Sequence, residues 1–181
     1  MNKASKHIVL GVTASIAIYK ACDLVRRLKE CGWEVEVVMT QEAREMIRPV
    51  VFQSLSGRPV YGGGLFDEPQ AWEIEHVSLA QKADLILIAP ATANIIAKLA
   101  SGICDDLLSC VVCASKAKVM IAPAMNQQMY QHKITQSNIA KLKACGYKFI
   151  PPRKGVLACG AAGEGCLAQV AEIIQEVKKI L

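Results

Sequence analysis

The chain has 181 residues, of which 52% are hydrophobic and only 5% aromatic, and its net charge is +5. A chain of this length is expected to form a single domain over residues 1–181 and to bury roughly 70% of its unfolded surface, so it does not need disulfides to fold. Its 21 basic residues are scattered rather than interleaved with aromatics, which argues against nucleic-acid binding. No segment reaches the roughly 18 apolar residues of a membrane span, and we expect a cytoplasmic protein with reduced thiols.

The eight cysteines are not expected to form a disulfide framework. Cys110 and Cys113 have the Cys-x-x-Cys spacing, but they fall inside a predicted helix over 107–116 and not at a helix start after a strand, where redox pairs lie. None of the three histidines has a spacing that suits zinc, so we expect no metal site. Buried structural cysteines are the interpretation that we favour for this pair.

Apolar strand-like runs alternate with amphipathic helices along the chain. This alternation predicts an α/β fold, with a Rossmann-like, doubly wound parallel sheet and helices on both faces. The first helix begins near Ile16 and is expected to end near Gly32, and the last runs from about Ala168. The predicted strands are His7–Val12, Glu34–Met39, Asp84–Ala89, Lys118–Ala122 and Tyr147–Ile150.

Two stretches rich in glycine or proline do not fit this alternation. They are Ser56–Gln70, with three consecutive glycines, and Pro151–Gly165, with a cysteine among glycines. Because binding and catalytic residues gather on such connections, we expect both stretches to be functional loops.

Small and hydroxyl residues follow the first predicted strand, in the segment Gly-Val-Thr-Ala-Ser-Ile-Ala at 11–17. A strand-to-helix turn of this kind leaves backbone N–H groups exposed at a helix start, where anions bind. It lacks Gly-x-Gly-x-x-Gly, so a monophosphate held by amides and the Ser15 hydroxyl fits better than a dinucleotide pyrophosphate. Taken alone, Ser15 is explained equally well as a helix N-cap.

Later strands also end in hydroxyl or amide residues. Thr40 follows the second strand, Thr92 and Asn94 follow the third, and Asn126 follows the fourth. The carboxyl ends of parallel strands meet at one crevice, where a flat apolar ring could lie on the small residues and bond to the polar ones. Each of these residues could separately be ordinary turn chemistry.

His76 opens the helical segment that leads to the third of these strands. With an ordinary pKa of roughly 6.5, a histidine could accept a proton from a thiol of pKa about 8.5 near neutral pH. An isolated histidine is more often structural than catalytic, and spacing alone does not place His76 in the crevice.

Together these segments resemble the homo-oligomeric flavin-containing cysteine decarboxylases over nearly the full length. The specific part is Pro-Ala-Met-Asn at 123–126 with a later Leu-Ala-Cys-Gly at 157–160, whereas the first turn alone would be a weak signal. His76 and Ala-Pro-Ala-Thr-Ala-Asn at 89–94 match in order and spacing.

The resemblance implies FMN-dependent decarboxylation of 4′-phosphopantothenoylcysteine to 4′-phosphopantetheine in coenzyme A biosynthesis. In that reaction FMN oxidises the thiol to a thioaldehyde, CO2 leaves, and reduced FMN returns a hydride to the enethiolate while an acid supplies a proton. The resemblance also implies a homo-oligomer, a trimer or a dodecamer of trimers, with flavin pockets shared between neighbouring subunits. Three alternatives are a peptidyl-cysteine decarboxylase of a precursor peptide, a flavin prenyltransferase and a flavin-binding regulatory subunit without turnover.

Residue roles follow from the same resemblance. His76 is expected to be the base or positioning group at the thiol, and Cys159 the proton donor of the last reduction. Asn126 would grip the substrate carboxylate, with Met125 and Ala158 beside the substrate. The expected FMN contacts are Gly11, Thr13, Ala14, Ser15, Ile16, Thr40, Thr92, Ala93, Asn94, Ile95 and Ala124.

The chain departs from the family pattern at four positions. Ala14 stands where glycine is usual, and Tyr130 where tryptophan is common. Cys166 and Gln169 stand where the motif commonly continues with a basic and an acidic residue. The chain ends at Leu181, which leaves no room for the synthetase domain that many bacterial relatives carry in fusion. We therefore expect the condensation step that comes before this decarboxylation to be performed by another protein.

Overall fold

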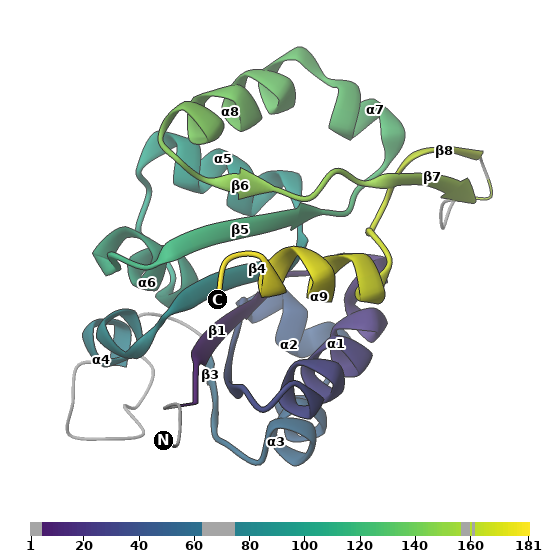
Figure 1. The fold of residues 1–181 in the computed structure, drawn as a ribbon. Helices are drawn as coiled ribbons and strands as arrows, with labels where there is room; N and C mark the ends of the chain where they lie inside the picture. Colours follow the sequence, from purple (N-terminus) through teal and green to yellow (C-terminus); the bar gives the residue numbers. More distant parts are fainter. Residues whose placement is uncertain (1–4, 63–74, 157–159, 161) are drawn as a thin grey trace.

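The computed structural model describes residues 5–62, 75–156, 160 and 162–181. A parallel sheet of six strands lies at its centre, in the order β3-β2-β1-β4-β5-β6 (Figure 1). The strand order reverses between β1 and β4, which is where α/β sheets place their ligands. The doubly wound sheet is therefore confirmed. Its strands are β1 (His7–Val12), β2 (Glu34–Met39), β3 (Val60–Gly62), β4 (Leu85–Ala91), β5 (Lys118–Pro123) and β6 (Lys148–Phe149).

Helices cover both faces of the sheet because each central strand is apolar on both sides. In β1, Ile8 and Leu10 pack into one core and Val9 packs into the other, as expected from the alternation of side chains along a strand. One face carries α1 (Tyr19–Glu30), α2 (Gln41–Met46), α3 (Pro49–Ser56) and α9 (Val170–Lys178). The other carries α4 (Glu75–Lys82), α5 (Ala93–Ser101), α6 (Leu107–Ala114) and α8 (Lys133–Ala144).

Local sequence accounts for the ends of several helices. The first helix starts as a short 3-10 turn, η1 (Ile16–Ile18), before α1 begins. Beyond the end of α1, Gly32 has a φ of +82°, a left-handed conformation that favours glycine, and this confirms the predicted stop. None of the described helices has the length and apolar character needed to span a membrane.

The segment Pro151–Gly165 is not simply a loop. It contains β7 (Arg153–Val156) and most of β8 (Ala162–Cys166), which pair antiparallel and form a hairpin apart from the main sheet. The prediction missed these strands because glycines at 155, 163 and 165 remove the apolar alternation that identifies a strand. The hairpin is tied to the body by a hydrogen bond of 3.0 Å from the Met125 amide to the Gly165 carbonyl.

The prediction for the cysteine pair in α6 is wrong in part, because Cys113 is exposed and Cys110 only partly buried. The buried face of α6 is formed by Leu107, Leu108 and Val111 together with Val112. On a helix of 3.6 residues per turn, that face leaves position 113 on the solvent side.

Candidate functional site

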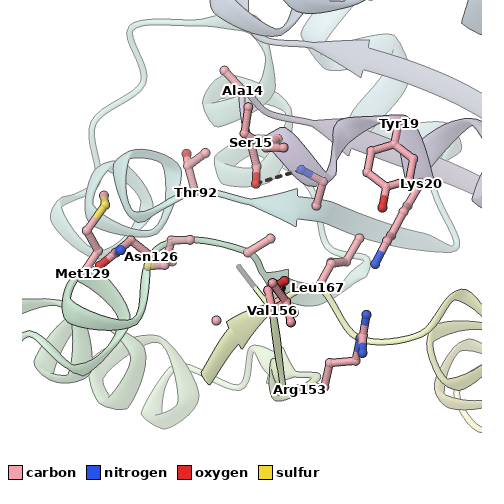
Figure 2. Close-up of a pocket in the computed structure, with 16 residues that line it drawn as sticks. Ala14, Ser15, Tyr19, Lys20, Thr92, Asn126, Met129, Arg153, Val156 and Leu167 are labelled. Carbon is pink, nitrogen blue, oxygen red and sulfur yellow. Dashed lines mark hydrogen bonds between the residues drawn. The ribbon is translucent and has the colours of Figure 1, made fainter. Parts of the chain in front are cut away.

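A pocket of about 490 Å³ opens beyond the carboxyl ends of β1, β4 and β5 (Figure 2). Four parts of the chain line it: the turn after β1 with the start of α1, the residue after β4, the turn after β5 with the short helix that follows it, and the hairpin β7–β8 with the residue after it. The pocket therefore lies at the reversal of strand order, where the sequence predicted a crevice.

The turn after β1 forms one wall. Ser15 is the N-cap of η1, and its Oγ accepts a hydrogen bond of 3.4 Å from the Ala17 amide. Ser15 also lines the pocket together with Ala14 and Ile16. The two interpretations of Ser15, a helix cap and a pocket residue, therefore hold together.

Thr13 supports this wall from behind. It is 1% exposed, and its hydroxyl donates to the Pro90 carbonyl at 2.8 Å and accepts from the Thr92 amide at 3.0 Å. Thr92 in turn caps α5, accepting from the Ile95 amide at 3.4 Å, and faces the pocket. Thr13 thus positions the pocket residue Thr92 and does not itself line the pocket.

Asn126 lies on the opposite side, at the start of α7 (Gln127–Gln131). Its Oδ1 accepts a hydrogen bond of 2.8 Å from the Gln128 amide and so caps this short helix. The preceding turn is fixed by the Ala124 amide, which donates to the Ala91 carbonyl at 2.9 Å. The end of β4 and the hairpin therefore hold the backbone that carries Asn126 in place.

The structure brings seven of the residues expected to contact cofactor or substrate into one pocket and leaves others outside it. Thr40 caps α2 by accepting from the Ala43 amide at 3.3 Å, and Ile95 is buried in the core. A Cβ on Gly11 would lie 2.6 Å from Leu108 Cδ1, so packing explains this glycine. The residues that line the pocket are Ala14, Ser15, Ile16, Thr92, Ala124, Met125 and Asn126, and those that do not are Gly11, Thr13, Thr40, Ala93, Asn94 and Ile95.

One of the two expected catalytic residues, His76, does not line this pocket. It is partly buried in α4, which packs against α6. Figure 1 shows α4 and the hairpin β7–β8 at opposite ends of the molecule. Cys159, like Ala158, lies outside the described residues.

The prediction missed several lining residues: Tyr19, Lys20, Met129, Arg153, Val156 and Leu167. Lys20 follows Ile16 by one helical turn, and this i, i+4 spacing could have identified it. Arg153 could be placed only by the pairing of β7 with β8. No group of three or more His, Cys, Asp and Glu in the described part of the chain is arranged to hold a metal.

This chain is similar in sequence to several known proteins and similar in fold to several solved structures. The probable phosphopantothenoylcysteine decarboxylase of Streptococcus mutans is 47% identical over 180 residues, covering 98% of this chain and 99% of that protein. The coenzyme A biosynthesis bifunctional protein CoaBC of Vibrio vulnificus is 47% identical over 171 residues, covering 94% of this chain but only 42% of that protein. The chain thus spans less than half of the bifunctional relative.

Two solved structures share the fold over nearly the whole chain. A PPC decarboxylase mutant complexed with pantothenoylaminoethenethiol has a TM-score of 0.87 and 29% identity, covering 97% of both chains. The FMN-dependent cysteine decarboxylase SpaF has a TM-score of 0.85 and 28% identity, covering 98% of both. The model of the Flavoprotein family matches residues 1–181. The chain therefore belongs to the Flavoprotein family, and the resemblance indicated by its motifs is confirmed.

Proposed function

We propose that this chain is an FMN-dependent phosphopantothenoylcysteine decarboxylase, which converts 4′-phosphopantothenoylcysteine to 4′-phosphopantetheine and CO2. The observation that carries the proposal is that Asn126 lines the same pocket as Ser15 and Thr92, although the three residues come from different strand ends. A relative of the same length at 47% identity, named as this decarboxylase, supports the same reaction.

The residues of the pocket fit a flavin. A volume of about 490 Å³ is in the range of small-molecule sites. Ala14 and Ala124 give a flat apolar surface for a ring, while Ser15 and Thr92 stand at helix starts that favour a phosphate. When bound, FMN would supply the two-electron oxidation of the substrate thiol and the later return of those electrons.

Asn126 is proposed to hold the carboxylate that leaves as CO2. An amide nitrogen donates hydrogen bonds but does not transfer protons near neutral pH, so its contribution is positioning. The cap on α7 and the bond from Met125 to Gly165 fix the backbone at this residue. Cys159, which falls between β7 and β8 in the sequence, is proposed to supply the proton of the final reduction.

His76 is proposed to act in the pocket of a neighbouring subunit, within a trimer or a dodecamer of trimers. Two observations support a second copy at this site. His76 does not line the pocket of its own chain, and the apolar side chains of Ile16 and Tyr19 at the pocket are 63% and 62% exposed. Adjacent exposed apolar groups of this kind are typical of interaction surfaces. We also propose a cytoplasmic location, in keeping with the seven free cysteines of the described residues.

Product masses test this proposal directly. The purified protein should be yellow and release FMN on denaturation. Incubation with phosphopantothenoylcysteine should give phosphopantetheine, whereas a peptide that ends in cysteine should remain unchanged. Decarboxylation of the peptide alone would establish the peptidyl-cysteine alternative, and FMN binding without either product would establish a regulatory subunit. His76→Asn is the control variant. It should retain the flavin and lose turnover, which would show that product formation requires His76 in addition to bound flavin.

A further inference from the structure

Two cationic side chains, Lys20 and Arg153, line the pocket away from Asn126. Lys20 comes from the first turn of α1, and Arg153 is the first residue of β7. Figure 2 shows their charged ends pointing toward one another on one side of the pocket, while Asn126 and Met129 lie on the other side. The pocket therefore carries its positive charge on one side, away from Asn126.

No acidic residue of the described chain balances this pair of charges. Neither side chain takes part in an ion pair within the described residues, and no Asp or Glu among them lines the pocket. Among the residues that the structure describes, the buried Arg153 Nε has no hydrogen-bond partner. Two like charges that face one another away from full solvation are unfavourable unless an anion lies between them.

The hairpin places the guanidinium at this position. Arg153 is the cross-strand partner of Cys166. A Cβ built on Gly155 would lie 3.2 Å from Cys166 Sγ and 3.3 Å from Arg153 Nη1. The guanidinium therefore lies in the space left by a glycine and a cysteine, and a larger side chain at 155 would displace it.

We propose that Lys20 and Arg153 form the subsite for the phosphomonoester of the substrate, at the far end of the pocket from Asn126. This inference rests on the proposed function, because the substrate named there carries a phosphate at one end and the reacting carboxylate at the other. A phosphate dianion matches two cations, and the planar fork of arginine bonds to two phosphate oxygens at once. The Lys20 ammonium lies 5.8 Å from the centre of the Tyr19 ring, a contact that helps to orient it.

The test measures binding of two products to the FMN-loaded protein by titration calorimetry. The probes are 4′-phosphopantetheine and pantetheine, which differ only in the phosphate. Arg153→Gln should raise the Kd for phosphopantetheine about 10- to 100-fold and change that for pantetheine less than about twofold. Lys20→Gln should have the same selectivity with a smaller effect, because lysine contributes a point charge instead of a fork.

Lys154→Gln is the matched control. It removes the same charge from the same strand, but Lys154 is exposed and does not line the pocket. Both Kd values of this variant should stay within about twofold of the wild type, since exposed charges contribute little. If Lys154→Gln lost as much affinity for phosphopantetheine as Arg153→Gln, the effect would come from the overall charge of the hairpin, and the proposal would be overturned.

Two further measurements are needed. One distinguishes the phosphate of the substrate from the phosphate of FMN, and the other distinguishes failure of the phosphate subsite from failure of the proposed function. FMN titration of the apoprotein should give the same affinity for Arg153→Gln and wild type. If FMN affinity falls while the preference for phosphopantetheine persists, the cations hold the cofactor phosphate, and the substrate subsite is wrong. If the wild type prefers phosphopantetheine through Arg153 but decarboxylates nothing, the proposed function fails and the phosphate subsite stands.

Discussion

The hydroxyl oxygen of Thr13 lies 3.0 Å from the backbone nitrogen of Thr92 and accepts its hydrogen bond. The same hydroxyl donates to the Pro90 carbonyl at 2.8 Å. A single buried side chain therefore joins the turn after β1 to the end of β4, the two strands between which the pocket opens. This linkage explains how the two walls are held at a fixed distance from one another.

Replacing Thr13 by valine should destabilise the fold and weaken flavin binding together. The variant keeps the side-chain volume but leaves the buried Thr92 amide without its partner, while the Pro90 carbonyl keeps only the longer bond of 3.4 Å from the backbone amide of residue 13. Burial of such groups costs about 1–3 kcal/mol of unfolding free energy. Urea unfolding and FMN titration measure the two effects. Thr13→Ser keeps the hydroxyl and should retain FMN affinity; equal affinity in the valine variant would show that Thr13 does not position the wall.

Replacing Asn126 by aspartate should separate its two roles. Aspartate caps helices as well as asparagine does, so unfolding free energy should change by less than about 0.5 kcal/mol. Its carboxylate would repel the carboxylate of the substrate at the point where the amide would donate to it, and turnover should fall at least about a hundredfold, since like charges brought together at a binding site cost several kcal/mol.

The outcome distinguishes a substrate contact from an ordinary turn asparagine. FMN absorbance should be unchanged in the Asn126 variant, which excludes loss of the cofactor as the cause. Wild-type turnover in a stable Asn126→Asp protein would restrict Asn126 to capping α7.

Gly165 is expected to be required for the geometry of the site. Its φ is +150°, and a Cβ there would lie 2.1 Å from the Met125 carbonyl oxygen. Gly165→Ala should push the hairpin away from Asn126 and reduce kcat/KM by about tenfold or more, as small displacements of positioning groups do. Gly146→Ala is the control, because that glycine also has a positive φ, +91°, but nothing lies within 4 Å of its added Cβ. A similar loss in both variants would point to backbone strain alone.

Sequence patterns predicted the central strands well because β1 and β4 are apolar runs whose local signals agree with their buried environment. They also placed Ser15, Thr92 and Asn126 at one crevice, since parallel strands present their ends to the same edge. Arg153 could not be found in this way. Its position depends on pairing between two glycine-rich strands, and such pairing leaves no periodic signal in the chain.

Motif matching alone does not separate residues that line the pocket from residues that support it. Thr13 and Thr40 fall in segments that match, yet one links two strand ends and the other caps α2. A hydroxyl at a strand end satisfies backbone groups as readily as it binds a ligand. Only the three-dimensional arrangement distinguishes the two uses.

The ion pair between Lys98 and Asp106 should make stability depend on pH in the acid range. Burial on its own would raise the pKa of Asp106, but the hydrogen bonds from Lys98, at 2.7 Å, and from Ser109 outweigh it and lower the pKa below its ordinary 3.8. The folded state therefore binds the proton less readily than the unfolded state does. The stabilisation is fully present above 3.8 and is lost as the pH falls through the lower folded value.

Asp106→Asn tests this dependence because it keeps the helix cap and removes the charge. Near neutral pH the variant should lose about 1–2 kcal/mol of unfolding free energy, and the difference should vanish in strong acid. Asp105→Asn is the control, since Asp105 contacts the same lysine at 2.7 Å but is 56% exposed, and its removal should change stability little. A difference between Asp106→Asn and wild type that is independent of pH would exclude the ion pair as its source.

Mixing two inactive variants should restore activity if the pockets are shared between subunits. His76 lies in α4 and Asn126 beside the pocket of its own chain, so an oligomer of His76→Asn and Asn126→Asp chains would contain some sites with both native residues. Random assembly from equal amounts after joint refolding should recover about a quarter of wild-type activity, if each site takes one residue from each of two neighbours. Mass photometry of the refolded mixture would verify that it forms the wild-type oligomer. Mixed oligomers without activity would mean that His76 serves no neighbouring pocket, because every other component of the site is supplied in the mixture.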